Sequence, residues 1–177
     1  MLNEGDGAPA FSIRPIFGHE IRVPAEGATG LQVLTFVGSL ASPFTRRWLS
    51  AFQDHFADFD RVGARVGAVA TCAVADAQDF VPRYHLLYPL AADPAGAIAE
   101  RFAVQRDRTL LRSIRGGLIQ NARSALAFGV GWGSGSVRTL PAVFVIDPAG
   151  SVRWRQYAQS ISDVPDIEAL LLCVSSF

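Results

Sequence analysis

The chain has 177 residues, a formal charge of zero and a composition that is half hydrophobic and 18% charged. This is long and apolar enough for one packed domain, over residues 1–177, without metals or disulfides. The balanced charge argues against nucleic acid as a partner, and the lack of lysine excludes lysine Schiff-base chemistry.

The termini and the cysteines point to a simple cytoplasmic protein. No apolar run approaches the ~20 residues of a membrane helix, and residues 1–11 are acidic and polar where a signal peptide would be basic and then apolar. Cys72 and Cys173 form no CxxC motif and have no metal-ligand spacing. No dinucleotide or phosphate-binding fingerprint is present either. We therefore expect no membrane association, no metal and no cofactor.

The first third of the chain predicts a hairpin followed by a strand and a helix. Residues 11–13 and 21–23 form the arms of the hairpin, and the β-branched and leucine-rich segment 31–37 is typical of a buried strand. Small residues follow over 38–42, and Pro43 opens an amphipathic helix that reaches about residue 56. A strand that leads into a helix N-terminus places unpaired N–H groups where an anion could bind.

The middle of the chain alternates strand and helix. The pattern predicts a strand over 65–71, a helix over 75–84, an extended piece over 86–93 and a helix over 94–102. This order implies right-handed crossovers and a parallel sheet flanked by helices.

The last third is divided between an insertion and a closing unit. Residues 105–138 alternate arginine with leucine and isoleucine and then become rich in glycine. This predicts one helix, or a pair of helices broken at residues 116–117, followed by a loop. Residues 143–147 and 152–157 predict a second hairpin, and 163–174 predicts a terminal helix.

Several of these strings resemble one family. The segments GDGAPAFSI, DFVPRYHLLYPLAADPAGAIAERFAV and LPAVFVIDPAGSVRW are similar to the opening, middle and end of peroxiredoxin-like AhpC/TSA proteins. The resemblance implies an α/β thioredoxin-like fold with a central mixed sheet flanked by helices. The implied fold also has an N-terminal hairpin, and it has a helical and glycine-rich insertion before the last hairpin.

The resemblance also shows what this chain lacks. In such proteins the active thiol lies in the loop or first helical turn after the central strand, where this chain has Ser42 and Thr45. A hydroxyl there has too high a pKa to ionise and has no sulfenate cycle. Pro141 also stands where peroxidases of the family tend to keep an arginine. The resemblance therefore implies that ordinary peroxidase activity is absent.

Two residues carry alternative interpretations. Ser42 is either a substrate contact or the N-cap of the helix, which its place before Pro43 favours. Cys72 should emerge at the same sheet edge as Ser42, either as a relocated thiol or, as we favour, as a small core residue.

Further residues are candidates for the walls of a pocket. Arg46 could bind a carbonyl or an anion, and Phe44 and Trp48 could shape the cavity. Leu140 and Pro141 resemble the dipeptide that faces the active-site loop in thioredoxins, where the proline is cis; an ordinary trans bond is the alternative. The last two candidates, Trp132 and Arg138, could form a lid with the glycine-rich loop between them; the alternative is that this loop is merely disordered.

These residues favour a cofactor-independent enzyme. It would use Ser42, Thr45 and Arg46 to isomerise or cyclise a small hydrophobic molecule, in specialised metabolism. The alternatives are a non-catalytic binding or scaffold protein, which could be a homodimer, and a thiol oxidoreductase that acts through Cys72.

Overall fold

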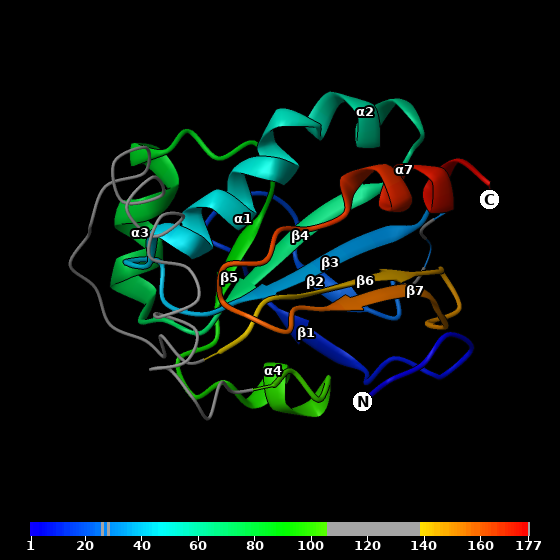
Figure 1. The fold of residues 1–177 in the computed structure, drawn as a ribbon, viewed down its shortest axis with the longest axis horizontal. Helices are drawn as coiled ribbons and strands as arrows, with labels where there is room; N and C mark the ends of the chain where they lie inside the picture. Colours follow the sequence, from blue (N-terminus) through cyan, green and yellow to red (C-terminus); the bar gives the residue numbers. More distant parts are fainter. Residues whose placement is uncertain (26, 28, 106–138, 177) are drawn as a thin grey trace.

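The computed structural model describes residues 1–25, 27, 29–105 and 139–176. Apart from Gln105, the predicted insertion over 105–138 lies outside the described residues. The elements are, in chain order, β1 (Phe11–Ile13), β2 (Ile21–Val23), β3 (Gln32–Val37), α1 (Pro43–Asp54), α2 (Phe56–Arg61), β4 (Arg65–Ala70), α3 (Val74–Arg83), β5 (Leu90–Ala92), α4 (Ala97–Arg101), β6 (Ala142–Ile146), β7 (Val152–Tyr157) and α7 (Ile167–Ser175) (Figure 1).

Five strands form the central sheet, in the order β5-β4-β3-β6-β7, while β1 and β2 pair separately. The central strand, β3, is parallel to β4 and antiparallel to β6, so Val33 lies between Val66 and Val145. The sheet is mixed because helices connect β3 to β4 and β4 to β5, whereas a tight turn joins β6 to β7. The predicted central mixed sheet is confirmed.

The two faces of the sheet bury separate cores. Val33 and Val37 face the larger core beneath α1, α2, α3 and α7, and Leu34 and Phe36 face the smaller core beneath the β1-β2 hairpin and α4. This alternation follows from the two-residue period of a strand. Figure 1 shows α1, α2 and α7 on one side of the sheet and β1 and α4 on the other.

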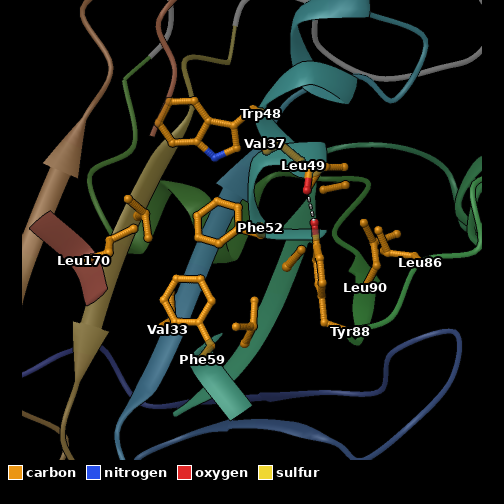
Figure 2. Packing of buried hydrophobic residues seen from close by; sticks show 14 of the residues in the cluster. Val33, Val37, Trp48, Leu49, Phe52, Phe59, Leu86, Tyr88, Leu90 and Leu170 are labelled. Atoms are coloured by element: carbon orange, nitrogen blue, oxygen red, sulfur yellow. Dashed lines mark hydrogen bonds between the residues drawn. The ribbon is translucent and has the colours of Figure 1, made fainter. Parts of the chain in front are cut away.

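Hydrogen bonds inside the larger core hold α1 in place on both sides. The fully buried indole of Trp48 donates to the Thr35 hydroxyl at 2.8 Å, and that hydroxyl donates to the Ala142 carbonyl at 3.2 Å. On the other side, the Tyr88 hydroxyl donates to the Leu49 carbonyl at 2.7 Å, within the cluster that Figure 2 shows. The middle of α1 is therefore fixed relative to β3 and β6.

Three helix boundaries differ from the prediction. The predicted helix from Pro43 to about residue 56 ends at Asp54, and α2 continues to Arg61. The helix predicted from residue 94 begins at Ala97, and the helix predicted from residue 163 begins at Ile167.

The two late starts have one cause, which is an aspartate that accepts hydrogen bonds from the first helical N–H groups. Asp93 accepts from the amides of residues 97, 98 and 99, and Gly96 between them takes a left-handed φ of 69°. Asp166 accepts from the Ala169 amide and is the N-cap of α7. Before these capped starts, residues 94 and 95 form a turn, and residues 163–165 are neither helix nor strand.

We expect Thr35→Val to lower the free energy of unfolding by about 1–3 kcal/mol, because it leaves the buried Trp48 N–H without an acceptor. Urea denaturation followed by tryptophan fluorescence measures this. Thr35→Ser is the matched control, since it keeps the hydroxyl and loses only a methyl group. If both variants lose the same stability, the hydrogen bond does not stabilise the fold as argued.

Candidate functional site

The site begins where β3 ends and α1 starts. Ser42 occupies the N-cap position, with Pro43 at the first helical position, as predicted, but its hydroxyl makes no capping hydrogen bond. The N–H groups of Phe44 and Thr45 also have no acceptor among the described residues. The helix start therefore presents both a hydroxyl and free N–H donors, with the positive end of the helix dipole behind them.

A small hollow lies in front of this helix start, which we call the α1 hollow. Its volume is about 10 Å³, which suits about one water-sized oxygen atom. The described residues that line it are Gly38, Ser39, Ser42, Phe44, Thr45, Thr139, Pro141 and Ile161.

The described lining of the α1 hollow is neutral and rich in hydroxyl groups. Ser39, Thr45 and Thr139 are buried, and Ser42 is partly exposed. No charged side chain is among the described lining residues. Such a lining can donate several hydrogen bonds to one oxygen atom but offers no side chain that titrates near neutral pH.

The structure brings four of the predicted residues together at this hollow: Ser42, Phe44, Thr45 and Pro141. Sequence reasoning missed Ser39, Thr139 and Ile161, which come from three separate segments. Ser39 could have been predicted as a lining residue, because its hydroxyl lies in the same small-residue loop as Ser42.

Arg46 does not line the hollow. Its buried guanidinium turns toward the loop instead and donates to the carbonyls of Leu40 and Ala41, both at 3.1 Å. Its carbon also lies 5.4 Å from the centre of the Tyr84 ring, within cation–π range. These contacts hold the loop between β3 and α1, and the predicted binding of a carbonyl or an anion by Arg46 stays a prediction.

Two other predicted pocket residues lie in the core. Trp48 is fully buried with its indole bonded to Thr35, and Leu140 is 5% exposed within the same larger core. Neither lines the α1 hollow. The predicted lid residues, Trp132 and Arg138, lie outside the described residues.

Pro141 lies against the hollow with a trans peptide bond. Among the described residues, the cis bond is the one between Val23 and Pro24. The prediction of a cis Leu140–Pro141 bond, which the thioredoxin resemblance implied, is therefore wrong. The bond is trans, as in the alternative interpretation. Pro141 still contributes an apolar wall to the hollow.

Cys72 reaches the predicted edge of the sheet but points into the core. It follows Thr71, whose N–H donates to the Val37 carbonyl at 2.9 Å, so both strands end side by side. The Cys72 side chain is 1% exposed and packs in the larger core. Burial, helped by the nearby Asp76, raises the pKa of its thiol to about 12.

The described part of the chain holds no group of three or more histidine, cysteine, aspartate or glutamate side chains that could bind a metal ion. Over the same residues, no helix combines the length and apolar character needed to cross a bilayer.

The fold is similar to those of known peroxiredoxins. Peroxidoxin BcpB from Mycobacterium tuberculosis superposes with a TM-score of 0.72 at 20% identity, over 100% of this chain and 99% of that one. Peroxiredoxin Q from Xanthomonas campestris gives a TM-score of 0.68 at 16% identity, over 94% and 90% of the two chains. The reduced 2-Cys peroxiredoxin of Plasmodium vivax gives 0.70 at 14% identity, over 95% and 78%.

These identities are low enough that the structures support the fold alone, and they confirm the predicted thioredoxin-like arrangement. No curated protein matches the chain in sequence. The model of the AhpC/TSA family, however, matches residues 5–155, which is most of the chain. The protein therefore belongs to the AhpC/TSA family.

Proposed function

We propose that this protein is a peroxiredoxin-like protein without a peroxidatic thiol, and that it is a cofactor-independent enzyme. The α1 hollow holds one oxygen atom of a small hydrophobic molecule, such as a carbonyl oxygen, and the molecule is isomerised or cyclised. The observation that carries this proposal is the neutral, hydroxyl-lined hollow at the start of α1, where Ser42 and Thr45 stand in place of cysteine.

The two cysteines support the absence of thiol chemistry. With a pKa of about 12, only about one Cys72 side chain in 100,000 is a thiolate at pH 7. Cys173 lies on α7, and burial raises the pKa of its thiol as well. Neither cysteine lines the α1 hollow, so a thiol oxidoreductase acting through Cys72 is the weakest alternative.

In the proposed chemistry the α1 hollow supplies hydrogen-bond donors that polarise the carbonyl group. The hydroxyls of Ser42, Thr45 and Thr139, with the free N–H groups at the start of α1, can stabilise negative charge that develops on a carbonyl oxygen. The apolar part of the molecule would lie against Phe44 and Ile161. Arg46 acts in this scheme by holding the loop.

A second candidate is a binding protein without catalysis. It is favoured by the size of the hollow, since pockets for small molecules usually measure about 300–1,000 Å³. The lack of a titratable side chain among the described lining residues also favours it, because proton transfer needs an acid and a base. A homodimer and a cytoplasmic location remain predictions under both candidates.

For the missing thiol, we expect no consumption of hydrogen peroxide above the uncatalysed rate when dithiothreitol is the reductant. In a Cys72→Ala, Cys173→Ala background, we expect Ser42→Cys or Thr45→Cys to create a thiol that iodoacetamide alkylates at pH 7, because the helix start lowers its pKa. Ser50→Cys, further along α1, is the matched control and should react more slowly. Peroxide turnover by the unmodified chain at peroxiredoxin rates would refute the proposal.

The buried Cys72 should also appear in the pH dependence of stability. A thiol whose pKa is higher in the folded state stabilises the protein fully below its unfolded pKa, near 9, and this stabilisation is lost as the pH rises toward 12. Between pH 9 and 10 the free energy of unfolding should therefore fall more steeply than in Cys72→Ala, by up to about 1.4 kcal/mol per pH unit. Urea titrations at a series of fixed pH values measure how the free energy of unfolding depends on pH in the unmodified chain and in Cys72→Ala. Equal slopes in the two proteins would show that Cys72 ionises as freely in the folded state as in the unfolded state.

Acetophenone, a small aromatic ketone, is a probe of the α1 hollow. On binding, its infrared carbonyl stretch should move to lower frequency, and Ser42→Ala or Thr45→Val should each weaken binding about fivefold by removing one donor. Ser50→Ala on the same helix is the control. If neither substitution changes the affinity for acetophenone, the proposed site is contradicted. If cyclisable ketones bind but NMR detects no product, the second candidate is favoured.

A further inference from the structure

The loop before α1 has used its hydrogen-bond acceptors within the protein. The carbonyls of Ser39 and Ser42 accept from backbone N–H groups at 3.1 and 3.2 Å. The two carbonyls between them, those of Leu40 and Ala41, accept from the Arg46 guanidinium at 3.1 Å each. All four carbonyls of residues 39–42 are therefore engaged.

The donors at the same place have no such partners. The N–H groups of Phe44 and Thr45 donate to none of the described residues. Because α1 is 12 residues long, the positive end of its dipole adds to these two donors. The start of α1 thus has a surplus of hydrogen-bond donors over acceptors.

Two buried hydroxyl groups give a second, independent indication of a ligand. Thr45 is 5% exposed and Thr139 is 7% exposed, and both line the α1 hollow. Neither hydroxyl forms a hydrogen bond with a described residue, and neither oxygen belongs to the fully enclosed atoms without a partner. An occupant of the hollow can therefore reach both hydroxyls. Since a buried hydroxyl without an acceptor is unfavourable, the hollow favours an occupant that accepts hydrogen bonds.

The size of the hollow selects among acceptors. Its volume of about 10 Å³ suits a particle about as large as one water molecule. Phosphate and sulfate have four oxygen atoms around a centre and are too large to enter whole. A water molecule fits, but it brings two hydrogens of its own, and the loop carbonyls that could accept them are already engaged. An ion of one atom fits and only accepts hydrogen bonds.

The described residues do not set a carboxylate against such an ion. None of the described lining residues is acidic. The acidic residue nearest in sequence to the lining Ile161 is Asp163, whose carboxylate accepts from the Gln159 and Ser160 amides at 2.7 and 3.1 Å. Those two N–H groups offset its charge. A negative ion in the hollow therefore meets donors and the helix dipole.

We infer that the α1 hollow binds one chloride ion. The ion accepts hydrogen bonds from the N–H groups of Phe44 and Thr45 and from the hydroxyls of Thr45 and Thr139. It competes for these donors with the carbonyl oxygen of the proposed substrate. This competition rests on the proposed function, whereas the binding of chloride does not.

The test is a titration of the ¹⁵N-labelled full chain by two-dimensional NMR, in which sodium chloride replaces sodium gluconate at constant ionic strength. We expect saturable shifts of the Phe44 and Thr45 amides, with a dissociation constant of about 10 mM. Only the identity of the anion changes, so screening of surface charges is the same throughout. Sodium sulfate at the same ionic strength should not reproduce these shifts, and this control does not depend on how a variant folds.

On the protein side, Thr45→Val and Thr139→Val should each weaken chloride binding about threefold to tenfold by removing one donor. Ser50→Ala, further along α1, is the matched control and should leave it unchanged. Three results would each overturn the inference: equal shifts with sulfate, unchanged affinity in both threonine variants, or no saturable shift up to about 200 mM chloride.

Acetophenone separates this inference from the proposed function. At a chloride concentration equal to the dissociation constant of the ion, the apparent dissociation constant for acetophenone should rise about twofold. If chloride binds and acetophenone does not, the proposed function fails and the ion site stands. If acetophenone binds and chloride shifts neither amide, only the ion site fails. If both bind without affecting each other, the competition is refuted.

Discussion

The hydrogen bonds from Trp48 to Thr35 and from Thr35 to Ala142 connect the helix of the candidate site to the two central strands. Because Thr35 is fully buried in an otherwise apolar core, its hydroxyl must be paired within the protein, and this requirement fixes α1 relative to β3 and β6. Arg46 then holds the carbonyls of the loop between β3 and α1. The position of the α1 hollow depends on these contacts more than on any residue that lines it.

The lining of the α1 hollow determines what it can hold. At the carboxyl end of β3, side-chain hydroxyls such as those of Ser42 and Thr45 surround a space of atomic size. This arrangement suits a single oxygen atom, because several hydroxyls can converge on one point.

Much of the fold could be predicted because its strongest signals are local. The apolar runs over 31–37 and 65–71 and the hairpin predicted over 143–157 correspond closely to β3, β4 and the β6-β7 pair. The helices α4 and α7 were predicted to start too early, because apolar periodicity does not show which aspartate accepts the first N–H bonds. At the site, Ser42, Thr45 and Pro141 were predicted from the resemblance, while Thr139 and Ile161 were missed because they come from distant segments.

The sequence by itself determined that no thiol stands at the start of α1, because the identity of the residues at 42 and 45 does not depend on how the chain folds. Only the tertiary structure decided that Arg46 turns to the loop and that Cys72 is buried with a raised pKa. The physical reason is that the direction and burial of a group depend on contacts with residues far away in the chain, which local patterns do not record.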